Sequence, residues 1–139
     1  MSRSLCIQRI SLTRYQYEIP DLGLDYNGFN QVFLQGARLP HTGYVLSVET
    51  DAGIVGEYVG GNAASYAQVG MVAEYLLGKN PLQRERIYND LKRGLRKLDR
   101  MGIGPIDIAL WDIAGKLYQA PISELLGGYR ERLPAYAST

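Results

Sequence analysis

The chain has 139 residues, which is a typical length for a single domain. Its 15 Lys and Arg side chains nearly balance 14 Asp and Glu, so charge gives no reason to expect binding to nucleic acid or an anionic membrane. Cys6 is the only cysteine, which excludes an internal disulfide, and no Cys and His spacing suggests a metal site. With no apolar run of membrane-spanning length, these features predict a globular cytoplasmic domain.

The first third of the chain predicts a strand followed by a long loop. Residues 5–19 are rich in β-branched and aromatic side chains, and Pro20 closes the run. Residues 21–42 carry several glycines and a second proline, which favour a loop. A loop of this length is either a binding loop or lid, or a disordered or packed Ω-loop, and the sequence favours neither. His41, the lone histidine, is interpreted as a surface or packing residue.

Residues 43–61 give the clearest pattern, which predicts a β-hairpin. Alternating side chains in "GYVLSVE" and "IVGEYV" flank the tight connection "TDAG". Asp51 and Gly53 suit turn positions, Gly53 because it tolerates a positive φ. Together with the first strand, the hairpin predicts a three-stranded antiparallel sheet.

Two amphipathic helices are expected next. Residues 63–78 place apolar side chains on one face, and Gly78 ends the helix. The pair Asn80–Pro81 predicts the start of the second helix, with Asn80 as N-cap and Pro81 at the first helical position. Its apolar positions extend to Leu98, and the basic run at residues 91–100 is interpreted as a solvated helix face.

A third helix is expected from "GIGPIDIALWDIAGKLYQAP", residues 102–121. Gly104 is the expected N-cap, so that Asp107 lies in the first turn, where a carboxylate meets free N–H groups. The polar stripe is narrow, with Asp112 and Lys116 four residues apart as a supporting pair. The rest of the surface is apolar, which is typical of a helix buried between two layers. So few residues can hardly supply the second layer, so we expect a missing partner around Trp111.

The end of the chain predicts a short helical turn over residues 122–128 and a strand over residues 133–138. No later segment is present to pair with that strand, and natural domains normally protect such edges. We therefore expect the parent protein to continue beyond it.

These last segments resemble a known family. The run "IDIALWDIAGKLYQAPISELLGG" followed by "LPAYAST" resembles the domain junction of the enolase superfamily, in its mandelate racemase and muconate lactonizing enzyme branch. The resemblance implies an α+β fold: a three-stranded antiparallel β-meander followed by a helical bundle, ending in the first strand of a (β/α) barrel. Residues 1–128 would form the N-terminal capping domain, and residues 129–139 would begin the truncated barrel.

The resemblance also implies a reaction. In this family a base removes the proton α to a carboxylate, and Mg²⁺ stabilises the product anion. The catalytic and metal-binding residues belong to the barrel, so none is expected in this chain, and the fragment alone should be inactive. The parent would be a sugar-acid dehydratase or racemase, an isomerase or lyase, acting on a carboxylate-containing small molecule and forming a homo-oligomer.

Two loops of a capping domain close over the substrate in the family. By position, the first corresponds to residues 22–33, and the second to residues 60–63. The residues expected to contact or enclose the substrate are Asp25, Tyr26, Asn27 and Phe29 in the first loop, and Gly60, Gly61 and Asn62 in the second. The alternative function is a free-standing α+β binding or dimerisation module without catalysis, whose apolar helix is covered by a second copy.

Overall fold

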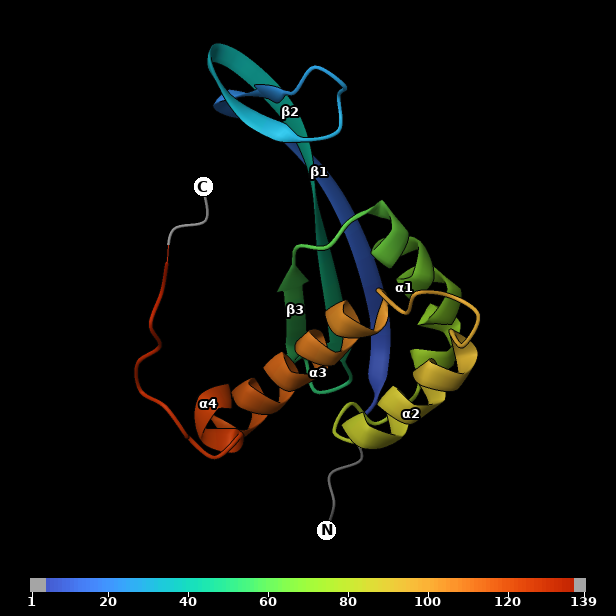
Figure 1. Ribbon diagram of the computed structural model, residues 1–139. Helices are drawn as coiled ribbons and strands as arrows, with labels where there is room; N and C mark the ends of the chain where they lie inside the picture. The colour runs from blue at the N-terminus through green and yellow to red at the C-terminus, as the bar shows by residue number, and fades with distance from the viewer. Residues whose placement is uncertain (1–4, 137–139) are drawn as a thin grey trace.

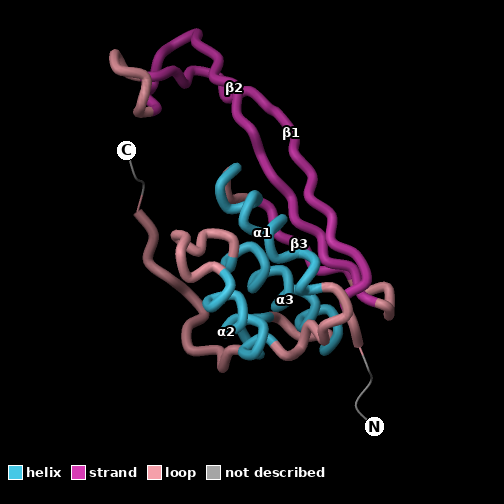
Figure 2. The backbone as a smooth tube through the Cα atoms, turned by 90° about the vertical axis from the view of Figure 1, so that its right-hand side faces the viewer, coloured by secondary structure: helices cyan, strands magenta, loops and turns pink. Residues whose placement is uncertain are grey.

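Three strands precede the helices along the chain, as the sequence predicts. The computed structural model describes residues 5–136. Figure 1 shows the elements in order: β1 (Ile7–Leu24), β2 (Gln31–Thr50), β3 (Val55–Val59), α1 (Ala63–Leu76), α2 (Arg84–Gly94), α3 (Ile103–Tyr118) and α4 (Ile122–Leu125). The helices lie on one face of the sheet, so the molecule has one sheet layer and one helical layer (Figure 2). This arrangement confirms the α+β class.

The sheet is an antiparallel meander in the order β1-β2-β3. Leu46 and Val48 of β2 are fully buried and face the helices, because alternate side chains of a strand point to one side. The tight turn between β2 and β3 is the predicted one: Gly53 has φ 74° and donates its N–H to the Thr50 carbonyl at 3.0 Å.

The predicted loop over residues 21–42 is wrong. β1 continues past Pro20 to Leu24 and β2 begins at Gln31, so only residues 25–30 connect the two strands. β3 pairs only with Val45 to Glu49 of β2, and beyond that point β1 and β2 form a two-stranded ribbon. Figures 1 and 2 show this ribbon standing clear of the helices.

Prolines and glycines misled the sequence prediction because a two-stranded ribbon tolerates them. Each strand of the ribbon has a free edge, where a residue without an N–H breaks no ladder hydrogen bond. Pro20 lies opposite Arg38. The register shifts just after Pro20, where Asp21 and Gly36 have φ 55° and 79°, and the Asp21 carboxylate accepts the Gly36 N–H at 2.7 Å.

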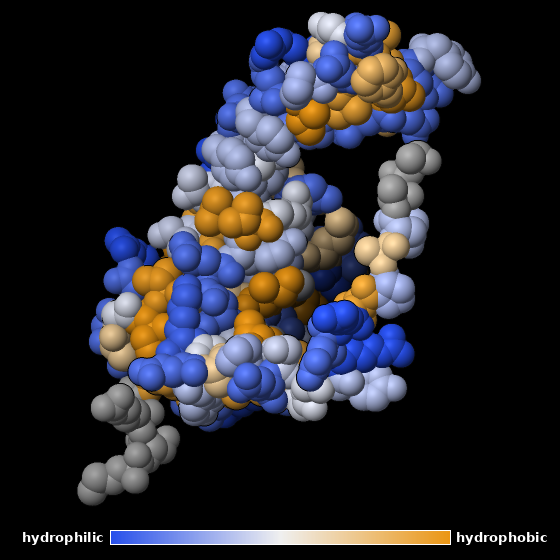
Figure 3. Space-filling view, turned by 90° about the vertical axis from the view of Figure 1, so that its left-hand side faces the viewer, coloured by the Kyte–Doolittle hydropathy of each residue, from blue (hydrophilic) through white to orange (hydrophobic). Residues whose placement is uncertain are grey.

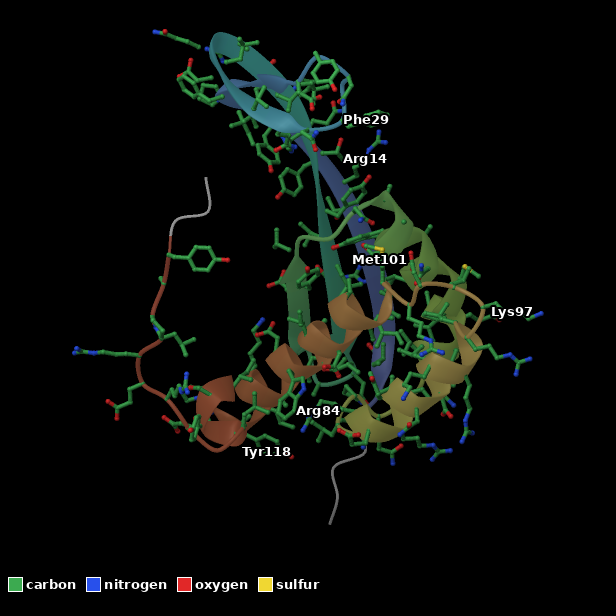
Figure 4. All side chains as sticks on the ribbon, in the orientation of Figure 1. Arg14, Phe29, Arg84, Lys97, Met101 and Tyr118 are labelled. Carbon is green, nitrogen blue, oxygen red and sulfur yellow. The ribbon has the colours of Figure 1, made fainter. Side chains whose placement is uncertain are left out.

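α2 is shorter than predicted at both ends. Asn80 caps a turn, accepting the Leu82 N–H at 2.9 Å through its side chain, and the helix starts only at Arg84. The helix ends at Gly94, and Leu98 lies in the following segment, 43% exposed. The basic run at residues 91–100 is largely solvated, and Lys97 points away from the body (Figure 4).

α3 begins earlier than predicted. Its N-cap is Gly102, whose N–H donates to the Gln68 side chain at 3.0 Å, so Gly104 is already helical. Asp107 therefore lies beyond the first turn and has no capping role. Instead, partial burial raises the pKa of Asp107, opposed by the positive charge of Arg84.

The chain covers α3 in part: the sheet lies against one side, and α1 and α2 pack beside it. Ile113 and Ala114 are fully buried, and α3 contacts α1 and α2 as well as β2 and β3. Trp111 is partly covered by the Arg84 guanidinium, 3.8 Å from its ring centre. Part of α3 remains open, because Tyr118 is 57% exposed.

The predicted polar pair of α3 is confirmed and also joins two elements. Lys116 lies 2.7 Å from the Asp112 carboxylate. Asp112 accepts the Glu57 N–H at 2.8 Å, and Lys116 donates to the Val55 carbonyl at 2.7 Å. The pair therefore fixes α3 against β3 through backbone groups.

The end of the described chain differs from the expectation. The short helical turn is confirmed as α4, but residues 133–136 form no strand, and residues 137–138 of the predicted strand lie outside the described residues. The described sheet contains only β1, β2 and β3, so residues 133–136 have no strand beside them. A strand requires such a neighbour to share its backbone hydrogen bonds.

Candidate functional site

The first candidate loop, residues 25–30, is organised by its own polar side chains. The Asp25 carboxylate accepts the N–H groups of Phe29 at 3.0 Å and Asn30 at 3.2 Å, and the Asn30 amide at 2.6 Å. The Asn30 side chain, followed by these backbone groups, lowers the pKa of Asp25. Asn27 accepts the Phe29 N–H at 3.1 Å. Asp25 and Asn27 therefore hold the loop in shape, a role that their polarity alone did not reveal.

The aromatic residues of this loop point into solvent. Tyr26 is 100% exposed and Phe29 is 85% exposed, and Phe33 at the start of β2 is 77% exposed. Hydrophobic side chains gather at the free end of the ribbon (Figure 3), and Phe29 marks that end in Figure 4. A tight polar turn thus presents two aromatic rings, which suits contact with a ligand or a partner surface.

The second candidate loop joins β3 to α1. Gly60 and Gly61 have φ 137° and 75°, a region that glycine adopts without strain. Asn62 is the N-cap of α1: its side-chain oxygen accepts the Ser65 N–H at 3.0 Å, while the Ser65 hydroxyl accepts the Asn62 N–H at 3.0 Å. The side-chain oxygen of Asn62 is therefore used for capping. The NH₂ group of the same side chain is available for another contact.

The two loops lie at the two ends of the ribbon and are separated along it (Figure 1). The second loop is at the root of the ribbon and the first is at its free end (Figure 1). The β1–β2 ribbon therefore connects the two loops along its length.

Sequence analysis missed a cluster of tyrosines beneath the second loop. The rings of Tyr44 in β2 and Tyr66 in α1 pack against each other in a tilted arrangement with their centres 4.8 Å apart, and the Tyr44 carbonyl accepts the Gly60 N–H at 3.0 Å. Tyr58 lies against Gly60, because a Cβ on that glycine would be 2.8 Å from the Tyr58 hydroxyl. The 11 tyrosines in the sequence were a signal, but their gathering depends on the tertiary structure.

Two hollows of the described domain lie away from both loops. One is a groove of about 270 Å³ between α1 and α2, which includes Tyr75 and Asp90. A second, of about 450 Å³, lies at the start of α2 beside Trp111. Both are open to the surface.

Residues 5–136 provide no group of three or more His, Cys, Asp or Glu that could hold a metal ion. This part of the chain therefore brings together no carboxylate ligand set of the kind that Mg²⁺ prefers. No helix in the same part of the chain is both long and apolar enough to cross a membrane.

Comparison with known proteins identifies a family with the same α+β domain. Residues 37–127 match the family model for the N-terminal domain of mandelate racemase and muconate lactonizing enzyme. D-galactarolactone cycloisomerase of Agrobacterium fabrum is 43% identical over 102 residues, covering 68% of this chain and 27% of that protein. D-galactonate dehydratase of Cronobacter sakazakii is 36% identical over 109 residues, covering 72% and 28%.

Solved structures share the fold. The D-glucarate dehydratase of Agrobacterium tumefaciens, complexed with magnesium, superposes with a TM-score of 0.70 at 23% identity, covering 91% of this chain and 33% of that one. The chain thus spans between a quarter and a third of the length of these proteins. From its sequence match and its α+β architecture, the chain belongs to the N-terminal domain family of the mandelate racemase and muconate lactonizing enzymes, in the enolase superfamily.

Proposed function

We propose that this chain is the capping and specificity domain of an enzyme that acts on a sugar acid, by dehydration, racemisation or cycloisomerisation. Residues 1–128 form the cap, and residues 129–139 begin a barrel that carries the catalytic residues and the Mg²⁺. The observation that carries this proposal is the exposed aromatic end of the ribbon, supported by the names of the similar enzymes. We place the enzyme in the cytoplasm, in keeping with its single free cysteine.

The role of the cap is to enclose the substrate. The aromatic rings of the first loop cover the sugar acid, and the second loop closes the other side. Excluding water strengthens the electrostatic contacts of the reacting carboxylate with the barrel residues. The isolated chain is expected to be inactive, because the described residues provide neither the metal ligands nor a base in a site.

The test uses the protein that joins this domain to its barrel. Four compounds named in the similar enzymes are tested as substrates: D-galactonate, D-glucarate, galactarate and D-galactarolactone. They are called the sugar-acid panel below. We expect Tyr26→Ala with Phe29→Ala to raise KM roughly tenfold or more for the substrate used, because hydrophobic enclosure is lost. The melting temperature should stay unchanged, because both side chains are exposed.

The matched control is Met71→Ala, which removes another exposed apolar side chain, 68% exposed, on α1. It should leave KM unchanged. Wild-type protein that transforms no member of the panel would overturn the proposed function, and an unaltered KM in the loop variant would remove the first loop from it.

A further inference from the structure

Tyr66 is the one tyrosine whose hydroxyl is buried without a hydrogen-bond partner among residues 5–136. The side chain is 5% exposed. Buried tyrosine hydroxyls usually find a partner, because an unpaired polar group away from water costs free energy. Phenylalanine would fill the same space without that cost, so the hydroxyl calls for an explanation in another state of the protein.

The ring of Tyr66 lies directly against the second loop. A Cβ on Gly61 would be 3.3 Å from Cε2 of the Tyr66 ring and 2.7 Å from the Ser65 hydroxyl. Tyr66 lies in the first turns of α1, and helical side chains point back toward the N-terminus of their helix. The buried hydroxyl is therefore carried by a ring that runs alongside the N-terminal end of α1, where the loop enters.

The second loop has the freedom to take up another position. Gly60 and Gly61 are consecutive glycines with positive φ, so their backbone can turn without a side chain resisting it. The Gly60 N–H bond to the Tyr44 carbonyl, at 3.0 Å, holds the loop to the root of the ribbon. The loop also brings its own carbonyl groups, which can accept a hydrogen bond.

The chemistry of the hydroxyl suits a hydrogen-bond donor. Burial, together with smaller contributions from the nearby Tyr58 and Tyr15, raises the pKa of Tyr66 to about 12. The group therefore stays protonated at neutral pH and offers its O–H to an acceptor, but does not act as a base.

We propose that Tyr66 is a positioning residue for the second loop, donating its hydroxyl to a backbone carbonyl of that loop only in the substrate-bound position. This inference rests on the proposed function, since it assumes that the loop closes over a sugar acid. Tyr66 acts through the loop and does not itself contact the substrate.

The test compares Tyr66→Phe with Tyr75→Phe in the protein that joins this domain to its barrel. Tyr75 is a matched control, because it lies on the same helix and its hydroxyl already donates to Asp90 at 2.6 Å. Tyr66→Phe should raise KM roughly three- to tenfold with kcat unchanged, since the lost bond forms on binding. Its melting temperature should not fall. Tyr75→Phe should lower the melting temperature and leave KM unchanged.

A second measurement follows the loop itself. With the substrate from the sugar-acid panel bound, hydrogen exchange at residues 60–62 should slow in the wild type and in Tyr75→Phe, but less in Tyr66→Phe. A wild-type KM in Tyr66→Phe would overturn the inference alone. A fall in its melting temperature equal to that of Tyr75→Phe would also overturn it, because the hydroxyl would then be bonded without substrate. An inactive wild type would overturn the proposed function and this inference together.

Discussion

Gly56 determines how closely the sheet and α3 approach each other. A Cβ at this position would lie 2.1 Å from the Ala109 carbonyl oxygen and 2.5 Å from Cγ1 of Ile113. Both neighbours belong to the buried centre of α3, where neither backbone nor side chain can move aside. The absence of one methyl group therefore allows α3 to pack directly on β3, where Asp112 and Lys116 complete the contact through hydrogen bonds.

We expect Gly56→Ala to lower the free energy of unfolding by about 1–3 kcal/mol or more, because the added methyl overpacks a rigid contact. The matched control is Gly70→Ala within α1, where a Cβ would meet nothing within 4 Å. That change should stabilise the domain by about 0.5–1 kcal/mol through helix propensity. Urea unfolding of the two variants measures both effects, and equal stabilities would contradict the predicted contact.

At the scale of elements, the ribbon is the part of the fold with the least support. β2 is paired on both sides only from Val45 to Glu49, and the rest of its ladder with β1 has no third strand. Isolated two-stranded sheets are marginally stable in water. Two sets of local hydrogen bonds fix the shape of the ribbon. One is made by the Asp25 carboxylate in the loop at residues 25–30, and the other by the Asp21 carboxylate at the register shift after Pro20.

We expect amide hydrogens in the outer ribbon, at residues 16–24 and 31–42, to exchange faster than those of β2 at residues 45–49. The reason is that local opening of the outer ribbon exposes few buried apolar groups. Hydrogen exchange of the chain followed by mass spectrometry measures the difference. Equal protection along the whole of β2 would show that the ribbon opens only when the entire domain unfolds.

The sequence predicts those elements whose patterns lie within a few neighbouring residues. The hairpin around Gly53 and the apolar face of α3 depend on nearby residues, and both were found. The outer ribbon escapes prediction because Pro20 and Gly36 resemble strand breakers, although a free edge tolerates them. The Tyr44 and Tyr66 pair was missed because it joins residues from separate elements, which no local pattern reveals.

At the scale of the whole molecule, the exposed side of α3 is the open face of the domain. Ile108 is 45% exposed and Tyr118 is 57% exposed, and Leu126 after α4 is 65% exposed. Apolar surface of this kind usually attracts a partner. In the proposed enzyme the partner is the barrel, so the isolated chain has this face free.

We therefore expect the isolated chain to self-associate through this face. Replacing Ile108 and Tyr118 together by lysine should shift the chain toward a monomer, because two charges would have to be buried in the contact. Light scattering after size-exclusion chromatography measures the mass. The melting temperature of a dilute sample should change little. A wild-type chain that stays monomeric at high concentration would contradict the expectation.

The overhang of the ribbon has a mechanical consequence. From Tyr15 to Leu24 the arm extends roughly 30 Å, at about 3.3 Å per residue. A rotation of about 10° where the arm leaves the body would displace its end by roughly 5 Å, about the width of one sugar ring, from the same estimate. In the proposed enzyme, small changes beside Tyr44 and Gly43 would therefore move Tyr26 and Phe29 without altering either residue, and so change the size of the ligand that the cap can enclose.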